Sequence, residues 1–300
     1  MNKRKVYTAL LSVIAAFVVV IALFLIANAH TLPAKKSDYG FFDWVSYMLH
    51  MDTDAEGNHI GHGWEFIRGA GMTMLISIVG TVAGFIIGLG VAIVKTIPIG
   101  AEDHILKKAC LKVINGILNI YIEVFRGTPM MVQAMVVFYG LMQAFQIDLD
   151  AMTAGLLIVS INTGAYMAEI VRGGIEAVDK GQTEGAQAIG MSHWQTMTSV
   201  ILPQAIRNIL PATGNEFVIN IKDTSVLNVI SVSELYFATK TIKGSTYRTF
   251  EAFFIVGVIY FVLTFTVTRI LHIIEWLMDG TDHYELHAED DSATGEEATA

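Results

Sequence analysis

The sequence contains a single cysteine, Cys110, among its 300 residues. One cysteine excludes a disulfide within the chain and any metal site built from cysteine ligands. No segment matches the glycine-rich nucleotide-binding pattern that ends in Gly-Lys-Ser or Gly-Lys-Thr, and His-Glu-x-x-His does not occur. We therefore expect no catalytic site, no bound metal and no cofactor, and any step driven by ATP requires hydrolysis by another chain.

Charged residues are also scarce, at 16%, whereas 53% of the residues are hydrophobic and the mean hydropathy is +0.53. This composition lies outside the range of soluble globular proteins and predicts a membrane protein. The formal net charge is −9, but many of the acidic residues lie close to the C-terminus, in a segment without lysine or arginine. We expect residues 279–300 to form a disordered acidic tail, and we expect no nucleic-acid partner.

Residues 1–28 carry three basic residues at positions 3–5 and then remain apolar as far as Ala27. The run ends in Ala-Asn-Ala, a pattern found at signal-peptide cleavage sites. However, it is longer than the roughly 7 to 15 apolar residues of a signal peptide and matches the roughly 20 that span a bilayer. We predict an uncleaved transmembrane helix whose N-terminus is cytoplasmic, followed by an extracytoplasmic loop at residues 29–65.

Five further segments complete a predicted all-α bundle of six membrane crossings, with both chain ends in the cytoplasm. They cover residues 66–94, 130–145, 152–171, 207–237 and 252–278. The first of these five carries glycines at helical spacing, Gly80, Gly84, Gly88 and Gly90, which allow close helix packing. Thr128 and Pro129 are predicted to begin the second one, as cap and first residue.

A polar interruption at residues 177–203 separates two of the apolar segments. Gly190 predicts the end of one short helix, because glycine readily adopts the left-handed conformation that closes a helix. Ser192 with Gln195 forms a capping-box pattern that predicts the start of a second short helix. That helix runs into Leu202-Pro203, where proline can begin the next helix.

The spacing within this interruption resembles the EAA loop of ATP-binding-cassette (ABC) importer permeases, the segment by which those subunits bind their ATPase. Glu184-Gly185-Ala186 is followed by three residues, Gly190, nine residues and then Val200-Ile201-Leu202-Pro203. Gly185 and Val200 depart from the pattern, where alanine and isoleucine are usual. The resemblance implies contact with an ATPase by Glu184, Gly185, Ala186, Gly190, Leu202 and Pro203.

The segment 207–237 is long enough to cross a membrane but contains several polar side chains. Charged groups inside a membrane cost at least a few kcal/mol each, so they usually face a partner, a cavity or a substrate. Pro211 and Gly214 predict a broken or distorted helix there. The candidate pathway residues in this segment are Glu216, Lys222, Asp223, Thr224 and Ser225. In the alternative interpretation, Lys222 and Asp223 neutralise each other, or pair with Glu216, and only tie the bundle together.

A second group of candidates lies on the segment 152–171, where Asn162, Tyr166 and Glu169 recur near helical spacing. Hydrogen bonding between helices explains these residues as well as substrate contact does.

Three longer stretches resemble the polar amino-acid uptake group of ABC permeases: residues 122–133, 161–178 and 210–235. The resemblance implies a type I importer with a permease domain at residues 66–278. It also implies a second permease subunit, the same or homologous, a dimeric ATPase, and an extracytoplasmic binding protein that delivers a polar amino acid. By position, Lys222, Asp223, Thr224 and Ser225 would line its site in a bacterial inner membrane.

Two other classes of protein compete with this interpretation. A secondary transporter driven by an ion gradient would use Asp223 and Glu169 as coupling carboxylates, but it leaves the EAA-like loop unexplained, and the two halves show no inverted repeat of broken helices. A membrane receptor or scaffold would explain the loop as a partner surface, but it leaves the intramembrane polar residues without a role.

Overall fold

The computed structural model describes residues 3–53, 59–97, 100 and 104–278. The predicted acidic tail at 279–300 therefore lies outside the described residues. The long helices are α1 (Lys3–Ala29), α3 (Gly63–Lys95), α4 (Ile105–Gly127), α5 (Met130–Phe145), α6 (Ala151–Glu176), α9 (Leu202–Asp223) and α11 (Thr249–Met278). Shorter elements are η1 (Lys36–Asp38), α2 (Phe41–Leu49), β1 (Asp52–Thr53), β2 (His59–Ile60), α7 (Lys180–Ala188), α8 (His193–Thr196), η2 (Met197–Ile201), η3 (Thr224–Ile230) and α10 (Leu235–Thr246).

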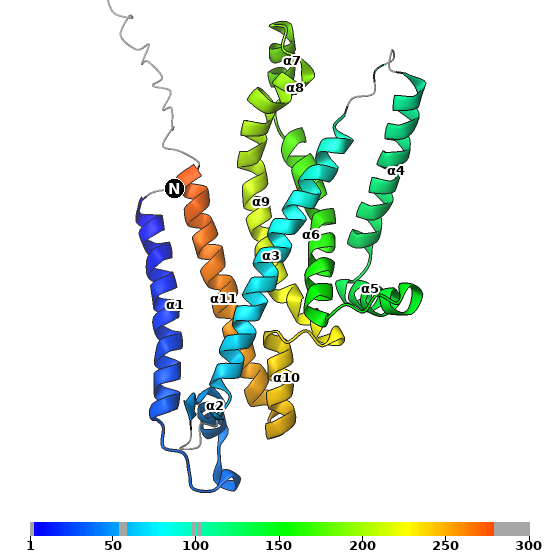
Figure 1. Cartoon of the computed structure of the whole chain (residues 1–300). Helices are drawn as coiled ribbons and strands as arrows, with labels where there is room; N and C mark the ends of the chain where they lie inside the picture. The colour runs from blue at the N-terminus through cyan, green and yellow to red at the C-terminus, as the bar shows by residue number, and fades with distance from the viewer. Residues whose placement is uncertain (1–2, 54–58, 98–99, 101–103, 279–300) are drawn as a thin grey trace, which may run out of the picture.

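The prediction of an all-α membrane bundle is confirmed, apart from the small antiparallel pairing of β1 with β2. Among the described residues, α3, α6 and α11 are long and apolar enough to cross a membrane, and α4 with α5 forms a fourth candidate that is bent by 115°. Crossings by α1 and α9 stay predictions. The start of α1, the end of α11 and the helices α7 and α8 lie at one end of the bundle, and α2 and α10 lie at the other (Figure 1).

Close packing of α3 on α6 forms the centre of the bundle. A Cβ at Gly80, Gly84 or Gly88 would clash with Val159, Thr163 or Met167 of α6, respectively. These glycines let the two backbones approach closely, as their spacing predicted. The prediction that Gly90 also takes part in this packing is wrong, because a Cβ there would meet nothing within 4 Å.

The bend between α4 and α5 corrects the prediction for the third crossing. Residues 130–145, predicted to cross the membrane alone, form α5, which follows the 23-residue helix α4 and runs across its end (Figure 1). Pro129 is the residue that caps α5, whereas Thr128 ends α4 and donates its hydroxyl hydrogen to the carbonyl of Val124 at 2.8 Å. A proline can begin α5 because it lacks the N–H that would be unpaired at this position.

The predicted break in the segment 207–237 lies farther along the chain than expected. Helix α9 continues through Pro211 and Gly214, and the backbone tightens into the 3₁₀ helix η3 only at Thr224. Membrane helices accommodate proline where neighbouring groups satisfy the freed carbonyl.

The end of the bundle that holds α2 has its own hydrophobic core. It is built from Trp44 and Met48 of α2, Phe66 of α3, and Leu235 and Ile255 of α10 and α11. At its edge, the His30 ring nitrogen lies 2.7 Å from Asp43. Hydrogen bonds from His30 and from the Gly40 backbone lower the pKa of Asp43. The core attaches the N-terminal residues firmly to α11.

Candidate functional site

One charged cluster collects side chains from three helices around Glu169 of α6. The Glu169 carboxylate lies 2.8 Å from Arg172 of the same helix, 3.9 Å from Arg126 of α4 and 4.0 Å from Lys95 of α3. Arg172 also contacts Glu176 at 2.7 Å. The cluster is therefore rich in cations, and the single carboxylate of Glu169 is shared among them.

Arg126 connects this cluster to the opposite side of the bundle. Its guanidinium lies over the Tyr166 ring, 5.6 Å from the centroid. It also interacts electrostatically with Glu216 of α9, a carboxylate that is only 7% exposed. Glu216 in turn interacts with Asp223, and Asp223 with Lys222. A series of charged side chains thus extends from the end of α4 to the end of α9, with the two carboxylates of Glu216 and Asp223 between the cations of Arg126 and Lys222.

Lys222 and Asp223 both have exposed side chains at the C-terminal end of α9. Among the described residues, no ion pair within 4.0 Å joins either of them to the other or to Glu216. The geometry therefore does not show the mutual neutralisation that was the alternative interpretation. Thr224 beside them is buried and donates its hydroxyl hydrogen to the carbonyl of Ile221 at 3.1 Å, and Ser225 is partly buried.

Asn162 contacts the backbone next to Arg126 and no charged side chain in the described residues. Its side-chain amide donates to the carbonyl of Phe125 at 3.1 Å and to Gln133 Oε1 at 2.8 Å. The Gln133 amide donates to the carbonyls of Phe125 and Thr128, both at 2.9 Å. Both amide hydrogens of Asn162 are therefore engaged in holding the bend between α4 and α5.

Two buried polar contacts escaped the sequence analysis. Asn220 of α9 donates to Thr81 of α3 at 2.9 Å and lies 3.0 Å from the hydroxyl of Thr163 of α6. Glu234 is fully buried; it accepts hydrogen bonds from the backbone N–H groups at the start of α10 and from the Tyr260 hydroxyl at 3.0 Å. Thr73 of α3 also donates its hydroxyl hydrogen to Glu234, at 3.4 Å, so each contact ties three helices together, as buried polar groups do when they are satisfied.

The polar interruption at 177–203 folds as the short helix α7, a turn at Gly190 and the start of α8. The predicted second short helix is not separate, because α8 continues without a break through the π-helix η2 into α9. The N–H groups of Gly190 and Met191 donate to the carbonyls of Gln187 and Ala186, at 2.9 and 3.1 Å, and Gly190 has a φ of +85°. This is the glycine-terminated end that the sequence predicted. The capping box of Ser192 and Gln195 is present at the start of α8.

The outer surface of this loop exposes two large apolar side chains beside Gly190. Ile189 is 79% exposed and Trp194 is 66% exposed, whereas Ala186 is buried. Glu184, Gly185 and Pro203 are also exposed, and Leu202 is partly buried. Large apolar groups in an otherwise polar surface are typical of a protein-binding site.

The comparisons with known proteins agree with this geometry. A family model described as "Binding-protein-dependent transport system inner membrane component" matches residues 111–278. The chain belongs to this family.

Individual relatives of this permease cover most of its length. The glutamine transport system permease protein GlnP of Escherichia coli (strain K12) is 38% identical over 210 residues, covering 70% of this chain and 90% of that protein. The arginine transport system permease protein ArtQ of Bacillus subtilis (strain 168) is 32% identical over 216 residues, 72% of this chain and 93% of that protein.

A solved structure described as an amino acid ABC transporter with histidines is 41% identical to the permease. The alignment covers 71% of this chain and 94% of that chain, with a TM-score of 0.64. The family model leaves residues 1–110 unmatched, so α1, α2, the whole of α3 and the first residues of α4 lie outside it.

The structure brings three of the predicted pathway residues of the permease together around one arginine. Tyr166, Glu169 and Glu216 gather around Arg126, which the sequence analysis did not select. Arg126 precedes Gly-Thr-Pro, next to a predicted crossing, and a charge at that place is the signal that could have identified it. The roles of all these residues in transport stay predictions.

Proposed function

We propose that this permease is the membrane-spanning subunit of an ATP-driven importer for a polar amino acid. The observation that carries the proposal is the series of charged side chains that runs from the end of α4 to the end of α9, in which the carboxylates of Glu216 and Asp223 lie between the cations of Arg126 and Lys222. An amino acid presents a carboxylate and an ammonium group, which require a cation and an anion respectively. The series supplies both.

The names of the relatives favour a site that binds the chemical groups that all amino acids share. Two relatives are named for glutamine and arginine, and the solved structure is named for histidines. These molecules differ in side-chain charge but have the same α-carboxylate and α-ammonium groups. We assign Arg126 to the carboxylate and Glu216 to the ammonium group, with Lys222, Asp223 and Ser225 farther along the path.

A second permease subunit, the same or homologous, is part of the proposal. Lys222 and Asp223 expose their charges in the single chain, at the end of a helix that is predicted to lie within the membrane. Charged groups at membrane depth need a polar or protein environment. A second subunit facing α9 would enclose them in a two-fold pathway.

The loop of α7 and α8 is the proposed contact with a dimeric ATPase. Ile189 and Trp194 supply apolar anchors, and Gly190 sets the angle between the two helices that present them. Closure of the ATPase dimer on ATP would draw two such loops together and favour an outward-open state, and hydrolysis would reverse the shift. The mechanism is a population shift caused by differential binding.

The proposed topology places the permease in the bacterial inner membrane with both termini and the loop in the cytoplasm. The start of α1, the end of α11 and the helices α7 and α8 lie at the same end of the bundle (Figure 1). The start of α4, which carries Lys107, Lys108 and Lys112, lies at that end as well (Figure 1), as the positive-inside rule requires. An extracytoplasmic binding protein would deliver the substrate at the other end.

Uptake of labelled amino acids tests this function directly. Cells that express the permease with its partner ATPase and binding protein are depleted of ATP or treated to collapse the proton gradient. Uptake that requires ATP and survives loss of the gradient supports the importer. Uptake that follows the gradient would indicate the secondary transporter, for which no comparison gives support.

Co-purification separates the importer from a receptor or scaffold. We expect the permease to bind an ATPase subunit that contains a nucleotide-binding pattern, and we expect Gly190→Asp to abolish both the binding and the uptake. A transporter unaffected by this substitution would contradict the proposed coupling.

A further inference from the structure

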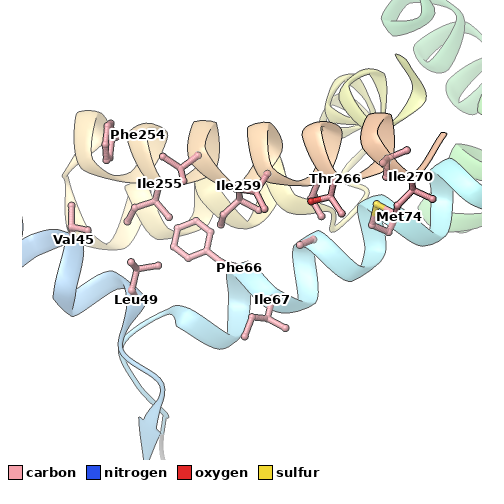
Figure 2. Close-up of a pocket in the computed structure, with 15 residues that line it drawn as sticks. Val45, Leu49, Phe66, Ile67, Met74, Phe254, Ile255, Ile259, Thr266 and Ile270 are labelled. Carbon is pink, nitrogen blue, oxygen red and sulfur yellow. The ribbon is translucent and has the colours of Figure 1, made fainter. Parts of the chain in front are cut away.

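A narrow groove runs along the surface between α3 and α11 (Figure 2). It has a volume of about 430 Å³ and is lined by α3 on one side, including Phe66 and Met74, and by α11 on the other, including Phe254 and Ile270. Val45 of α2 lies at one end of the groove. Among the described residues that line it, Thr266 alone has a polar side chain.

The shape of the groove suits a chain better than a compact ligand. From Phe254 to Ile270 it follows α11 for about 24 Å, at the rise of an α-helix. This length exceeds the depth of one leaflet of the hydrocarbon core, about 15 Å.

The helices that line the groove indicate that it faces membrane lipid. Both walls belong to helices that are long and apolar enough to cross a membrane, and only 17% of the most apolar window of α11 is buried within the chain. The charge series of the proposed pathway belongs to α4 and α9, which contribute no residue to the groove. If the second permease subunit faces α9, as the proposed function requires, the groove remains open to lipid.

The end of the groove at α2 has the composition of a membrane–water interface. The Arg248 guanidinium lies 4.7 Å from the centroid of the Trp44 ring, and the Lys36 ammonium lies 4.3 Å from that of Tyr47. Tryptophan and tyrosine favour the depth of lipid headgroups, and basic side chains bind phosphate. Glu251 lies 3.9 Å from Arg248, so the charge at this end is mixed.

We propose that the groove between α3 and α11 binds one acyl chain of a phospholipid, with the phosphate of its headgroup beside Arg248 and Trp44. The α2 helix gives this lipid a defined place, because Val45 closes the end of the groove while the neighbouring Trp44 carries the stacked Arg248. The bound lipid covers apolar surface of α3 and α11 that no described helix covers.

Measuring the lipid retained by the purified transporter tests the proposal. We expect the complete complex to retain a phospholipid through detergent washes, as quantified by mass spectrometry of the extracted lipid. Val262→Phe fills the groove and should reduce retention about tenfold, the factor that 1.4 kcal/mol of lost affinity produces. The matched control Val19→Phe, on the exposed face of α1, should leave retention unchanged. Equal retention by both variants would overturn the proposal.

Two further variants separate the acyl chain from the headgroup. Thr266→Val keeps the volume and makes the lining wholly apolar, so retention should be equal or higher. Arg248→Gln should lower retention of phospholipids, whereas a loss restricted to phosphatidylglycerol would show that a negatively charged headgroup is required in addition. Unchanged retention in Arg248→Gln would overturn the placement of the phosphate.

Photocrosslinking gives a result that does not depend on any substitution. A phosphatidylethanolamine with a photoreactive group in one acyl chain is incorporated into vesicles that contain the wild-type transporter. We expect labelled peptides from residues 66–74 and 254–270 in excess over those from the exposed faces of α4 and α5. Uniform labelling would overturn the proposal, as would crosslinks between two permease copies through the groove.

Discussion

Asn162 of α6 donates a hydrogen bond to the carbonyl of Phe125, 37 residues away, at the point where α4 turns into α5. The same amide also bonds Gln133, which itself bonds the carbonyl of Thr128. Two side-chain amides, one from α6 and one from α5, thus satisfy the backbone at a bend of 115°. Unpaired carbonyls are costly at membrane depth, so the bend depends on these two amides.

Replacement of Asn162 by leucine should destabilise the permease. Removing the donor leaves the buried Oε1 of Gln133 unsatisfied, which costs about 1 to 3 kcal/mol, whereas the carbonyl of Phe125 keeps its bond from the Gln133 amide. We expect a lower thermal unfolding temperature for the purified complex. Asn119→Leu is the matched control, because Asn119 is exposed on α4. An equal effect of both substitutions would exclude a specific role for Asn162.

Glu216→Gln should reduce uptake while the permease continues to fold. The substitution keeps the shape of the side chain but removes the charge that we assign to the substrate ammonium group. We expect a loss of about tenfold in uptake by proteoliposomes, which corresponds to about 1.4 kcal/mol. Glu176→Gln, an exposed carboxylate at the end of α6, is the control and should retain uptake.

A double substitution tests whether Glu216 and Arg126 act together. If both contact one zwitterion, the combined loss in Glu216→Gln with Arg126→Gln should be smaller than the product of the single losses. Independent, multiplicative effects would argue against a shared site.

Substitutions of the two loop glycines should have opposite effects. Gly190 has a φ of +85°, so Gly190→Ala should cost about 1 to 2 kcal/mol and disorder the bend. Gly185 lies inside α7 with open space around it, so Gly185→Ala should stabilise that helix by up to about 1 kcal/mol. Hydrogen exchange of residues 180–196 measures both. Faster exchange in Gly185→Ala would contradict this account.

Trp194→Ala should weaken ATPase binding and leave the fold intact. The side chain is 66% exposed, so its loss removes little from the core, whereas a buried tryptophan anchor at an interface contributes about 2 kcal/mol or more. We expect the dissociation constant of the ATPase complex to rise about 30-fold. Gln187→Ala, which truncates an exposed polar residue of α7, should change it little. Equal affinities for the two variants would remove Trp194 from the interface.

Several features of the fold are determined by interactions between residues that are close together in the sequence. The end of α7 at Gly190 and the capping box at Ser192 depend on residues close together in the chain, and both form as predicted. The apolar segments predicted a helical membrane bundle because bilayer thickness sets the length of a crossing. The glycines of α3 predicted close packing, although only the tertiary structure showed that Gly90 lies off the contact.

Only the tertiary structure decided which polar groups meet. Arg126 contacts Tyr166 and Glu169 because the bend after α4 places its end against α6, and no pattern near Arg126 contains that information. Glu234 is buried because Tyr260 and the start of α10 supply its hydrogen bonds. Helical periodicity specifies the faces of single helices. The partners of a buried charge are specified by how separate helices pack, which depends on the whole bundle.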